Sequence, residues 1–260
     1  MDEVLYERRG PGGWLRLNRP EEMNSLTPAM ISRLAEHIDR ARVDEEVRAL
    51  VITGSGRAFC AGGDLKAVRQ LAGMDPPGGH QILIDFASVL DSLQNLPKPV
   101  IAAVNGLTVA GGLELVLACD LVVAGDSAHI GDAHSNYGLI PGGGGSIRLP
   151  RRVGRSMAAW LFFTGQTLPA RDLVDCGLVN VVSADDELAA TVDDVVASIA
   201  GKSPLGLARM KRLLNDGLDQ SLSTGIRLEL LTSEAHAMSY DMAEGLAAFE
   251  EKRAPRFLGR

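Results

Sequence analysis

Apolar runs that alternate with stretches of helical spacing constrain this chain more than any other feature. Three compact runs, ALVITG (49–54), VIAAV (100–104) and LVVAG (121–125), are separated by segments with helical apolar spacing. Short runs without polar interruption are typical of strands that are covered on both faces. Their alternation with helices predicts an α/β fold with largely parallel strand pairing.

The flanking segments complete this pattern. VLYERR and WLRL read as two short strands joined by the turn-rich GPGG. Thr27 and Pro28 are an N-cap and first-turn signal for a helix with apolar residues at Met30, Leu34, Ile38 and Ala41. AHIG reads as a short strand, MAAWLFFTG and ARDLVDCG as helices, and LVNVVS as a last strand. From about residue 186 onward the pattern is helical throughout.

Composition excludes several classes of protein. The 260 residues are 46% hydrophobic and carry a net charge of -7, with basic residues spread along the chain, so we expect no nucleic-acid partner. No apolar run approaches a membrane span, and the N-terminal MDEVLYERRG has no apolar signal region. The widely spaced Cys60, Cys119 and Cys176 fit neither a disulfide framework nor a zinc site. We therefore expect a cytoplasmic protein without a metal.

Two glycine-bearing loops, residues 57–64 and 105–114, follow two of the apolar runs and lead into helical patterns. Amides at a helix start are unpaired, and glycine lets a ligand approach them closely. Two such amides aimed at one oxygen would form an oxyanion hole, although either loop is also an ordinary tight turn. Glu114, in the first turn of the second helix, is either a proton carrier or a residue that favours the helix dipole.

Six stretches together are similar to the enoyl-CoA hydratase/isomerase, or crotonase, superfamily. They are LNRPEEMNSL, LVITGSGRAFCAGGDL, PKPVIAAVNGLTVAGGLELVLACD, PGGGGSIRLPRRVG, LFFTGQTLPARDLVDCGLV and EGLAAFEEKRAPRF, which occur in the family's order over nearly the whole chain. The resemblance implies a crotonase-like spiral of ββα units with a helical C-terminal region. It implies an acyl-CoA substrate and no cofactor, since coenzyme A is part of the substrate. It also implies a homotrimer, or a hexamer made as a dimer of trimers.

The resemblance divides the chain and assigns the central residues. Residues 1–200 would form the acyl-CoA-binding and catalytic core, and residues 201–260 a helical oligomerisation region. The family's oxyanion-hole positions fall on Gly63 and Gly111, and the first catalytic glutamate of its hydratases falls on Glu114. The implied activity is hydration of a 2-enoyl-CoA in the breakdown of fatty acids or related acids.

One departure concerns the second catalytic glutamate of the hydratases, whose position is His134 here. Histidine can carry a proton near neutral pH, because its reference pKa is about 6.5. A neutral imidazole has one donor and one acceptor, whereas a carboxylate accepts on both oxygens. His134 is therefore either a substitute base or a polar residue that only lines the pocket.

Two alternatives to a hydratase remain open. Ser135, Asn136 and Tyr137 could bind an oxygenated acyl group, which would suit a carbon–carbon bond hydrolase or isomerase that uses Glu114 and His134. A catalytically weak acyl-CoA-binding protein is the second alternative, against which the presence of Gly63, Gly111 and Glu114 argues.

Further residues are assigned to substrate binding. Arg57 and Lys66 flank the AGGD loop and are placed for the phosphates of coenzyme A. Ala61 and Asp64 belong to the same loop, where Asp64 is better suited to cap the following helix. Lys252 and Phe257 resemble the family's C-terminal contacts to the nucleotide, which sometimes come from a neighbouring subunit.

Overall fold

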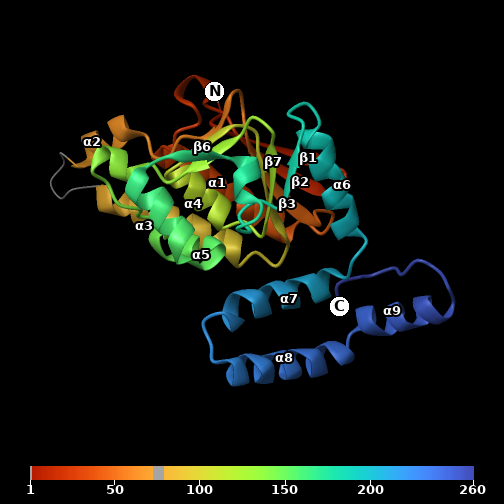
Figure 1. Ribbon diagram of the computed structural model, residues 1–260. Helices are drawn as coiled ribbons and strands as arrows, with labels where there is room; N and C mark the ends of the chain where they lie inside the picture. The colour runs from red at the N-terminus through yellow and green to blue at the C-terminus, as the bar shows by residue number, and fades with distance from the viewer. Residues whose placement is uncertain (1, 73–78) are drawn as a thin grey trace.

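The strands form two sheets within the body of the chain, as the computed structural model of residues 2–72 and 79–260 shows (Figure 1). The larger sheet has the order β1 (Val4–Arg9), β2 (Gly12–Leu17), β3 (Ala49–Gly54), β5 (Val100–Val104), β7 (Leu121–Gly125), β10 (Val181–Ser183). The smaller sheet has the order β4 (Ala58–Cys60), β6 (Leu107–Val109), β8 (His129–Gly131), β9 (Thr167–Pro169).

Strand pairing is parallel from β2 to β10 in the larger sheet, and β1 and β2 form an antiparallel hairpin. Every residue of β3 and β5 is buried. Parallel strands covered on both faces need such continuous apolar sequences. The predicted α/β class, the hairpin and the largely parallel pairing are confirmed.

The smaller sheet differs from the sequence-based expectation, which treated β4 and β6 as parts of loops. Each of these strands has only three residues, too few for an alternating pattern to show in the sequence. Each also follows a strand of the larger sheet within a few residues: β4 follows β3, β6 follows β5 and β8 follows β7. The chain thus repeats a long strand, a short strand and a helix.

The helices cover the sheets on both sides. They are α1 (Pro28–Val43), α2 (Leu65–Ala72), α3 (Gly79–Gln94), α4 (Gly111–Leu117), α5 (Gly145–Thr164), α6 (Leu188–Ala200), α7 (Pro204–Gly217), α8 (Leu222–Ala237) and α9 (Tyr240–Glu250), with short 3-10 helices η1 (Pro20–Glu22), η2 (His134–Tyr137) and η3 (Ala170–Leu173). ARDLVDCG, expected to be a helix, forms only η3 and turns. Within the described ranges, none of the helices combines the length and the apolar character needed to span a bilayer.

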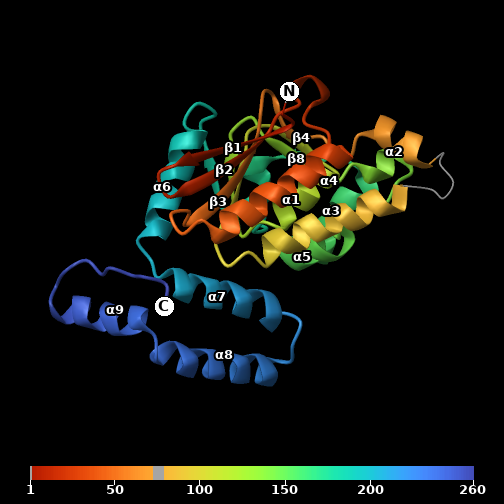
Figure 2. The same ribbon diagram turned by 180° about the vertical axis from the view of Figure 1, so that it is seen from behind.

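Helix α1 begins as its sequence predicts. The Oγ1 atom of Thr27 accepts a hydrogen bond from the Met30 amide at 3.0 Å, which satisfies one of the unpaired donors of the first turn. The apolar stripe of α1 is buried in the main core, together with α3 and one face of the larger sheet. Figure 2 shows α1 and α3 on this side, while α6 covers the opposite face, where Val192 packs with Trp14 and Ile101.

The C-terminal helices lie below the sheets in Figure 1. Helix α7 is attached to the body by Lys211, whose Nζ donates to the Leu93 and Lys98 carbonyls and to Asp120 Oδ2 at 2.7 Å. Helix α8, by contrast, has no buried residue. Since α6 ends at residue 200 and α7 starts at Pro204, the predicted division near residue 200 falls in the short connection between them.

Candidate active site

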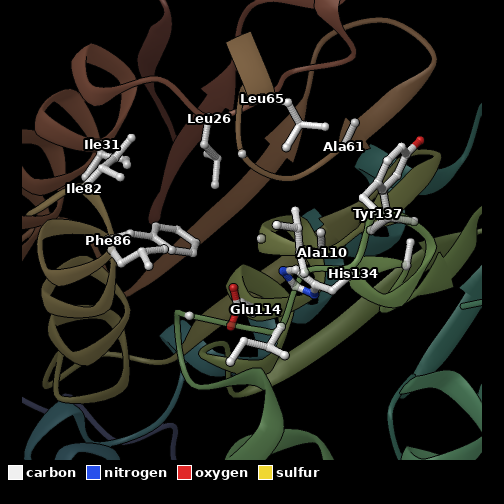
Figure 3. Close-up of a pocket in the computed structure, with 18 residues that line it drawn as sticks. Leu26, Ile31, Ala61, Leu65, Ile82, Phe86, Ala110, Glu114, His134 and Tyr137 are labelled. Atoms are coloured by element: carbon white, nitrogen blue, oxygen red, sulfur yellow. The ribbon is translucent and has the colours of Figure 1, made fainter. Parts of the chain in front are cut away.

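A mostly apolar cavity of about 210 Å³ opens where α3, the two glycine loops and η2 meet (Figure 3). Its walls consist of Leu26, Ile31, Ala61, Gly63, Leu65, Ile82, Leu83, Phe86, Val109, Ala110, Gly111, Glu114, Ala133, His134, Tyr137, Leu139, Ile140 and Gly142. Ionisable side chains therefore reach it from only three of the lining positions, Glu114, His134 and Tyr137.

Gly63 lines this cavity, and hydrogen bonds hold the residues on either side of it. The Leu26 amide donates to the Gly62 carbonyl at 2.7 Å, and the Asp64 amide donates to the Leu26 carbonyl at 2.9 Å. These two bonds fix the chain on either side of Gly63. The Gly63 amide itself donates to no acceptor among residues 2–72 and 79–260.

Gly111 presents a second amide. It is the first residue of α4, and Ala110 before it has φ 51° and ψ -120°, an unusual conformation for a residue with a side chain. The Ala110 amide is held by the Asp132 carbonyl at 2.8 Å. In the part of the chain that the structure describes, the Gly111 amide has no acceptor.

The two amides lie close together. A Cβ atom built on Gly111 would be 3.6 Å from the Gly63 nitrogen, and one built on Gly62 would be 2.7 Å from the Ala110 Cβ and 3.2 Å from the Gly111 nitrogen. Glycine at position 62 therefore permits the contact between the loops. Unpaired amides that face one cavity can stabilise negative charge on a single oxygen.

Glu114 is almost completely buried, with 3% of its surface exposed. Its Oε1 atom accepts hydrogen bonds from the amides of Gly143 at 2.7 Å and Gly145 at 2.8 Å. Burial raises the pKa of this carboxyl, and the Gly145 bond, the His134 imidazole and the Gly143 bond oppose the rise without cancelling it. With Oε1 occupied by two amides, Oε2 is the oxygen that can carry a proton.

The glycine run after Pro141 explains how those amides reach the carboxylate. A Cβ on Gly143 would lie 2.8 Å from Phe86 Cε1, and a Cβ on Gly142 would lie 2.7 Å from Leu83 Cδ2. Side chains of α3 thus pack directly on the backbone of the run. Gly144 has φ 94°, a conformation that lets the chain turn into α5 with the amides on either side of it aimed at Glu114.

His134 lies on the same wall as Glu114, and Figure 3 shows its ring near Ala110 and the Glu114 carboxylate. Its Nδ1 atom is 2.9 Å from Asp132 Oδ1. Its backbone amide donates to Asp132 Oδ2 at 3.2 Å. The side chain of His134 is 11% exposed and that of Asp132 is 2% exposed, so both are largely buried. The Nε2 atom has no hydrogen-bond partner among the described residues.

The polar residues after His134 are placed differently from each other. Tyr137 lines the cavity but is 69% exposed. Ala61, from the first glycine loop, also lines the cavity. Asn136 donates to the Gly165 carbonyl at 2.9 Å, and neither it nor Ser135 is a lining residue. Two of the three side chains that would suit an oxygenated acyl group are therefore not at the cavity.

The remaining predicted binding residues lie outside the cavity wall. Asp64 Oδ1 accepts from the Lys66 and Ala67 amides, as a cap of α2 does, and Oδ2 pairs with Arg19 at 3.1 Å. Arg57 and Lys66 are exposed. Lys252 follows α9, and Phe257 packs beside Gly245, remote in the chain from the cavity residues. Their contacts with coenzyme A stay a prediction.

The cysteines take no part in this arrangement. Burial raises the pKa of the Cys60 and Cys119 thiols to about 12, so neither is a nucleophile at neutral pH. Within residues 2–72 and 79–260, no group of three or more His, Cys, Asp or Glu side chains is arranged to hold a metal ion.

Comparison with known proteins decides the family. The sequence pattern of enoyl-CoA hydratase/isomerase matches residues 13–260. The chain belongs to this family. A 1,2-epoxyphenylacetyl-CoA isomerase of Escherichia coli (strain K12), similar to it over 251 residues, is 37% identical and is matched over 95% of this chain and 94% of its own.

Solved structures of the family share the fold. An enoyl-CoA hydratase from Bacillus anthracis superposes with a TM-score of 0.94 at 33% identity, over 99% of this chain and 100% of its own. An enoyl-CoA hydratase from Polaromonas sp. JS666 superposes with a TM-score of 0.95 at 33% identity, over 98% of this chain and 99% of its own. The crotonase-like spiral with a helical C-terminal region is confirmed, and the chain is an enzyme of the hydratase/isomerase family.

Sequence reasoning missed the residues that hold the side chains of Glu114 and His134. Asp132 precedes His134 by two residues, and an acidic residue at that spacing is a signal that could have been noticed. The amides of Gly143 and Gly145 could not have been assigned to Glu114, because the bonds span 29 and 31 residues.

Proposed function

We propose that this enzyme hydrates 2-enoyl-CoA thioesters. The observation that carries the proposal is that Gly63 and Gly111, whose amides have no acceptor among the described residues, line the same cavity as Glu114 and His134. Addition of water to a 2-enoyl thioester passes through an enolate. Two amide donors at its oxygen supply the stabilisation that this intermediate requires.

In the proposed reaction, His134 Nε2 takes a proton from water as the water oxygen bonds to C3. The C2–C3 double bond becomes an enolate, whose oxygen lies between the Gly63 and Gly111 amides. Glu114 Oε2 then gives its proton to C2, and the thioester carbonyl re-forms. Proton transfer from the imidazolium to Glu114 restores both groups. Water addition changes no net oxidation state, so the reaction needs no redox cofactor.

The apolar walls favour a hydrocarbon acyl group. Leu26, Ile82, Leu83 and Phe86 contribute them, and burial of each methylene from the substrate contributes about 0.8 kcal/mol. This supports a role in the breakdown of fatty acids. The carbon–carbon hydrolase alternative has less support, because Ser135 and Asn136 do not line the cavity, although Tyr137 does.

Incubation with crotonyl-CoA tests the proposal. We expect loss of the enoyl absorbance and formation of 3-hydroxybutyryl-CoA, identified by chromatography against the authentic compound. A protein that binds crotonyl-CoA without converting it would be the acyl-CoA-binding alternative. Conversion to any product other than the 3-hydroxy thioester would also overturn the assignment.

Gly111→Pro removes one proposed oxyanion donor, and we expect kcat to fall about 10²- to 10³-fold, which corresponds to about 2.7–4 kcal/mol. Position 111 is the first of α4, where a helix tolerates proline and needs no amide. Stopped-flow or steady-state hydration of crotonyl-CoA measures the loss.

Gly111→Ala is the matched control, because it keeps the amide and adds a Cβ only 3.1 Å from the flexible end of Leu26. We expect it to retain far more activity than Gly111→Pro. Circular dichroism establishes that both variants are folded. A folded proline variant as active as the alanine variant would refute the role of this amide.

We also propose that residues 201–260 bind other copies of this chain, as a homotrimer or a hexamer. Helix α8 has no buried residue, yet Leu222, Leu230, Leu231 and Met238 are exposed on it or at its end, and Phe249 of α9 is 84% exposed. Apolar surface of this extent marks an interface. Lys252 and Phe257 do not line the cavity of their own chain. In an oligomer they could contact the nucleotide of a coenzyme A that is bound to a neighbouring chain.

Multi-angle light scattering at micromolar concentration is expected to give the mass of three or six chains. Leu231→Glu places a charge on the exposed face of α8 and should shift the protein toward monomer. Val43→Glu makes the same change at the exposed last residue of α1 and should not shift it. A monomeric parent protein would contradict this assignment.

A further inference from the structure

We propose that Asp132 is a positioning residue that holds His134 in the tautomer with a proton on Nδ1, so that Nε2 accepts the proton of the attacking water. The inference rests on the proposed function for the role of the base. The tautomer itself is independent of what the enzyme converts.

Both oxygens of the Asp132 carboxylate contact His134. This carboxylate is 2% exposed, and both hydrogen bonds that the structure gives to it come from this one residue, from Nδ1 to Oδ1 at 2.9 Å and from the backbone amide to Oδ2 at 3.2 Å. A buried carboxylate is costly unless its oxygens are paired. Ala133, with φ 58°, makes the tight turn that brings both donors of His134 back onto it.

The chemistry of the pair determines the tautomer. An ionised carboxylate only accepts hydrogen bonds, so the neutral imidazole must donate from Nδ1. Nε2 then carries a lone pair, and it is the ring nitrogen that has no partner in the described part of the chain, on a residue that lines the cavity. When Nε2 takes a proton, the adjacent carboxylate stabilises the imidazolium that forms, as in other carboxylate–histidine pairs.

The backbone of Asp132 is bonded to the loop that carries Gly111. Its carbonyl accepts from the Ala110 amide at 2.8 Å, directly before the Gly111 amide that faces the cavity. This bond continues the parallel pairing of β6 with β8, in which Val109 lies opposite Gly131. The base and the oxyanion donor are thus held by one residue, and a change of its side chain leaves the backbone bond in place.

The test reads the tautomer directly. Long-range ¹H–¹⁵N spectra of the full-length protein, at a pH at which the ring is neutral, report which imidazole nitrogen is protonated. The chain has five histidines, and loss of one signal set in His134→Gln assigns His134. We expect protonation at Nδ1 in the parent. In Asp132→Ala we expect the signals to move toward the Nε2-protonated form.

Activity should follow the tautomer. Asp132→Ala should lower kcat for crotonyl-CoA hydration with little change in the affinity for coenzyme A. The loss is bounded by that of His134→Gln, about 10²- to 10⁴-fold. Asp132→Asn keeps an oxygen that can accept from Nδ1 and should lie between the parent and Asp132→Ala in both readouts. Asp132→Ala combined with His134→Gln should be no slower than His134→Gln alone, because the carboxylate acts through the histidine.

Asp126→Ala is the control, since this carboxylate lies six residues earlier and pairs with Arg171 on the surface. It should change neither the spectrum nor kcat. Protonation of His134 at Nε2 in the parent, or an Asp132→Ala protein with the parent's tautomer, would overturn the inference. Failure of the parent to hydrate crotonyl-CoA would contradict the proposed function and leave the tautomer result standing.

Discussion

Glu114→Gln is expected to lower kcat for 2-enoyl-CoA hydration by about 10²- to 10⁴-fold, the usual contribution of a general acid or base. Glutamine cannot deliver a proton to C2, but its amide oxygen can still accept from the Gly143 and Gly145 amides that hold Glu114 Oε1. The cavity should keep its shape. Steady-state kinetics with crotonyl-CoA, beside the dissociation constant of coenzyme A, separates loss of chemistry from loss of binding.

The same substitution is expected to make the protein more resistant to unfolding at neutral pH. Burial raises the pKa of Glu114, so the folded protein holds this proton more tightly than the unfolded chain does. Its contribution to stability is complete below the unfolded pKa and is lost as pH rises through the folded pKa. Glutamine stays neutral, so the melting temperature of Glu114→Gln minus that of the parent should increase with pH across this interval.

Two results would count against this view of Glu114. A variant with the parent's turnover would show that the carboxyl carries no proton in the reaction. A melting-temperature difference that falls with rising pH would show that the site favours the charged carboxylate, so that Glu114 could not be the acid.

His134→Gln is expected to lower kcat by a similar factor, about 10²- to 10⁴-fold, because glutamine fills the space of the ring but cannot accept the proton of water. Steady-state kinetics with crotonyl-CoA measures this loss.

His129→Gln is the matched control for this substitution. His129 is exposed at the start of β8, and its Nδ1 contacts the Ser127 carbonyl at 3.0 Å instead of a carboxylate. It should keep the parent's rate. If His134→Gln behaved in the same way, His134 would only line the pocket and another group would have to activate water.

Much of the fold could be predicted from the sequence because its central strands are buried on both faces. β3 and β5 read as continuous apolar runs, and the Thr27 cap marks the start of α1. The strands of the smaller sheet could not be found in this way. Ala58–Cys60 and Leu107–Val109 are too short for periodicity, and their pairing with each other joins residues about fifty positions apart.

The site divides in the same way. Gly63, Gly111, Glu114 and His134 could be selected from local sequence, and the structure brings them to one cavity. The side chains that surround them depend on tertiary contacts. From sequence, His134→Glu looks like a restoration of a hydratase pair, but Asp132 Oδ1 is 2.9 Å from the ring nitrogen. A glutamate there would set two carboxylates against each other.

The contact between α3 and the glycine run links substrate range to catalysis. Leu83 and Phe86 line the cavity and also pack closely on Gly142 and Gly143, in the glycine run whose Gly143 amide holds the Glu114 carboxyl. Trimming either side chain to admit a bulkier acyl group also removes support from the proton donor. A substitution on α3 that changes which acyl group fits is therefore expected to change the turnover rate as well. A second substitution, in the glycine run, would be needed to restore the position of the Glu114 carboxyl.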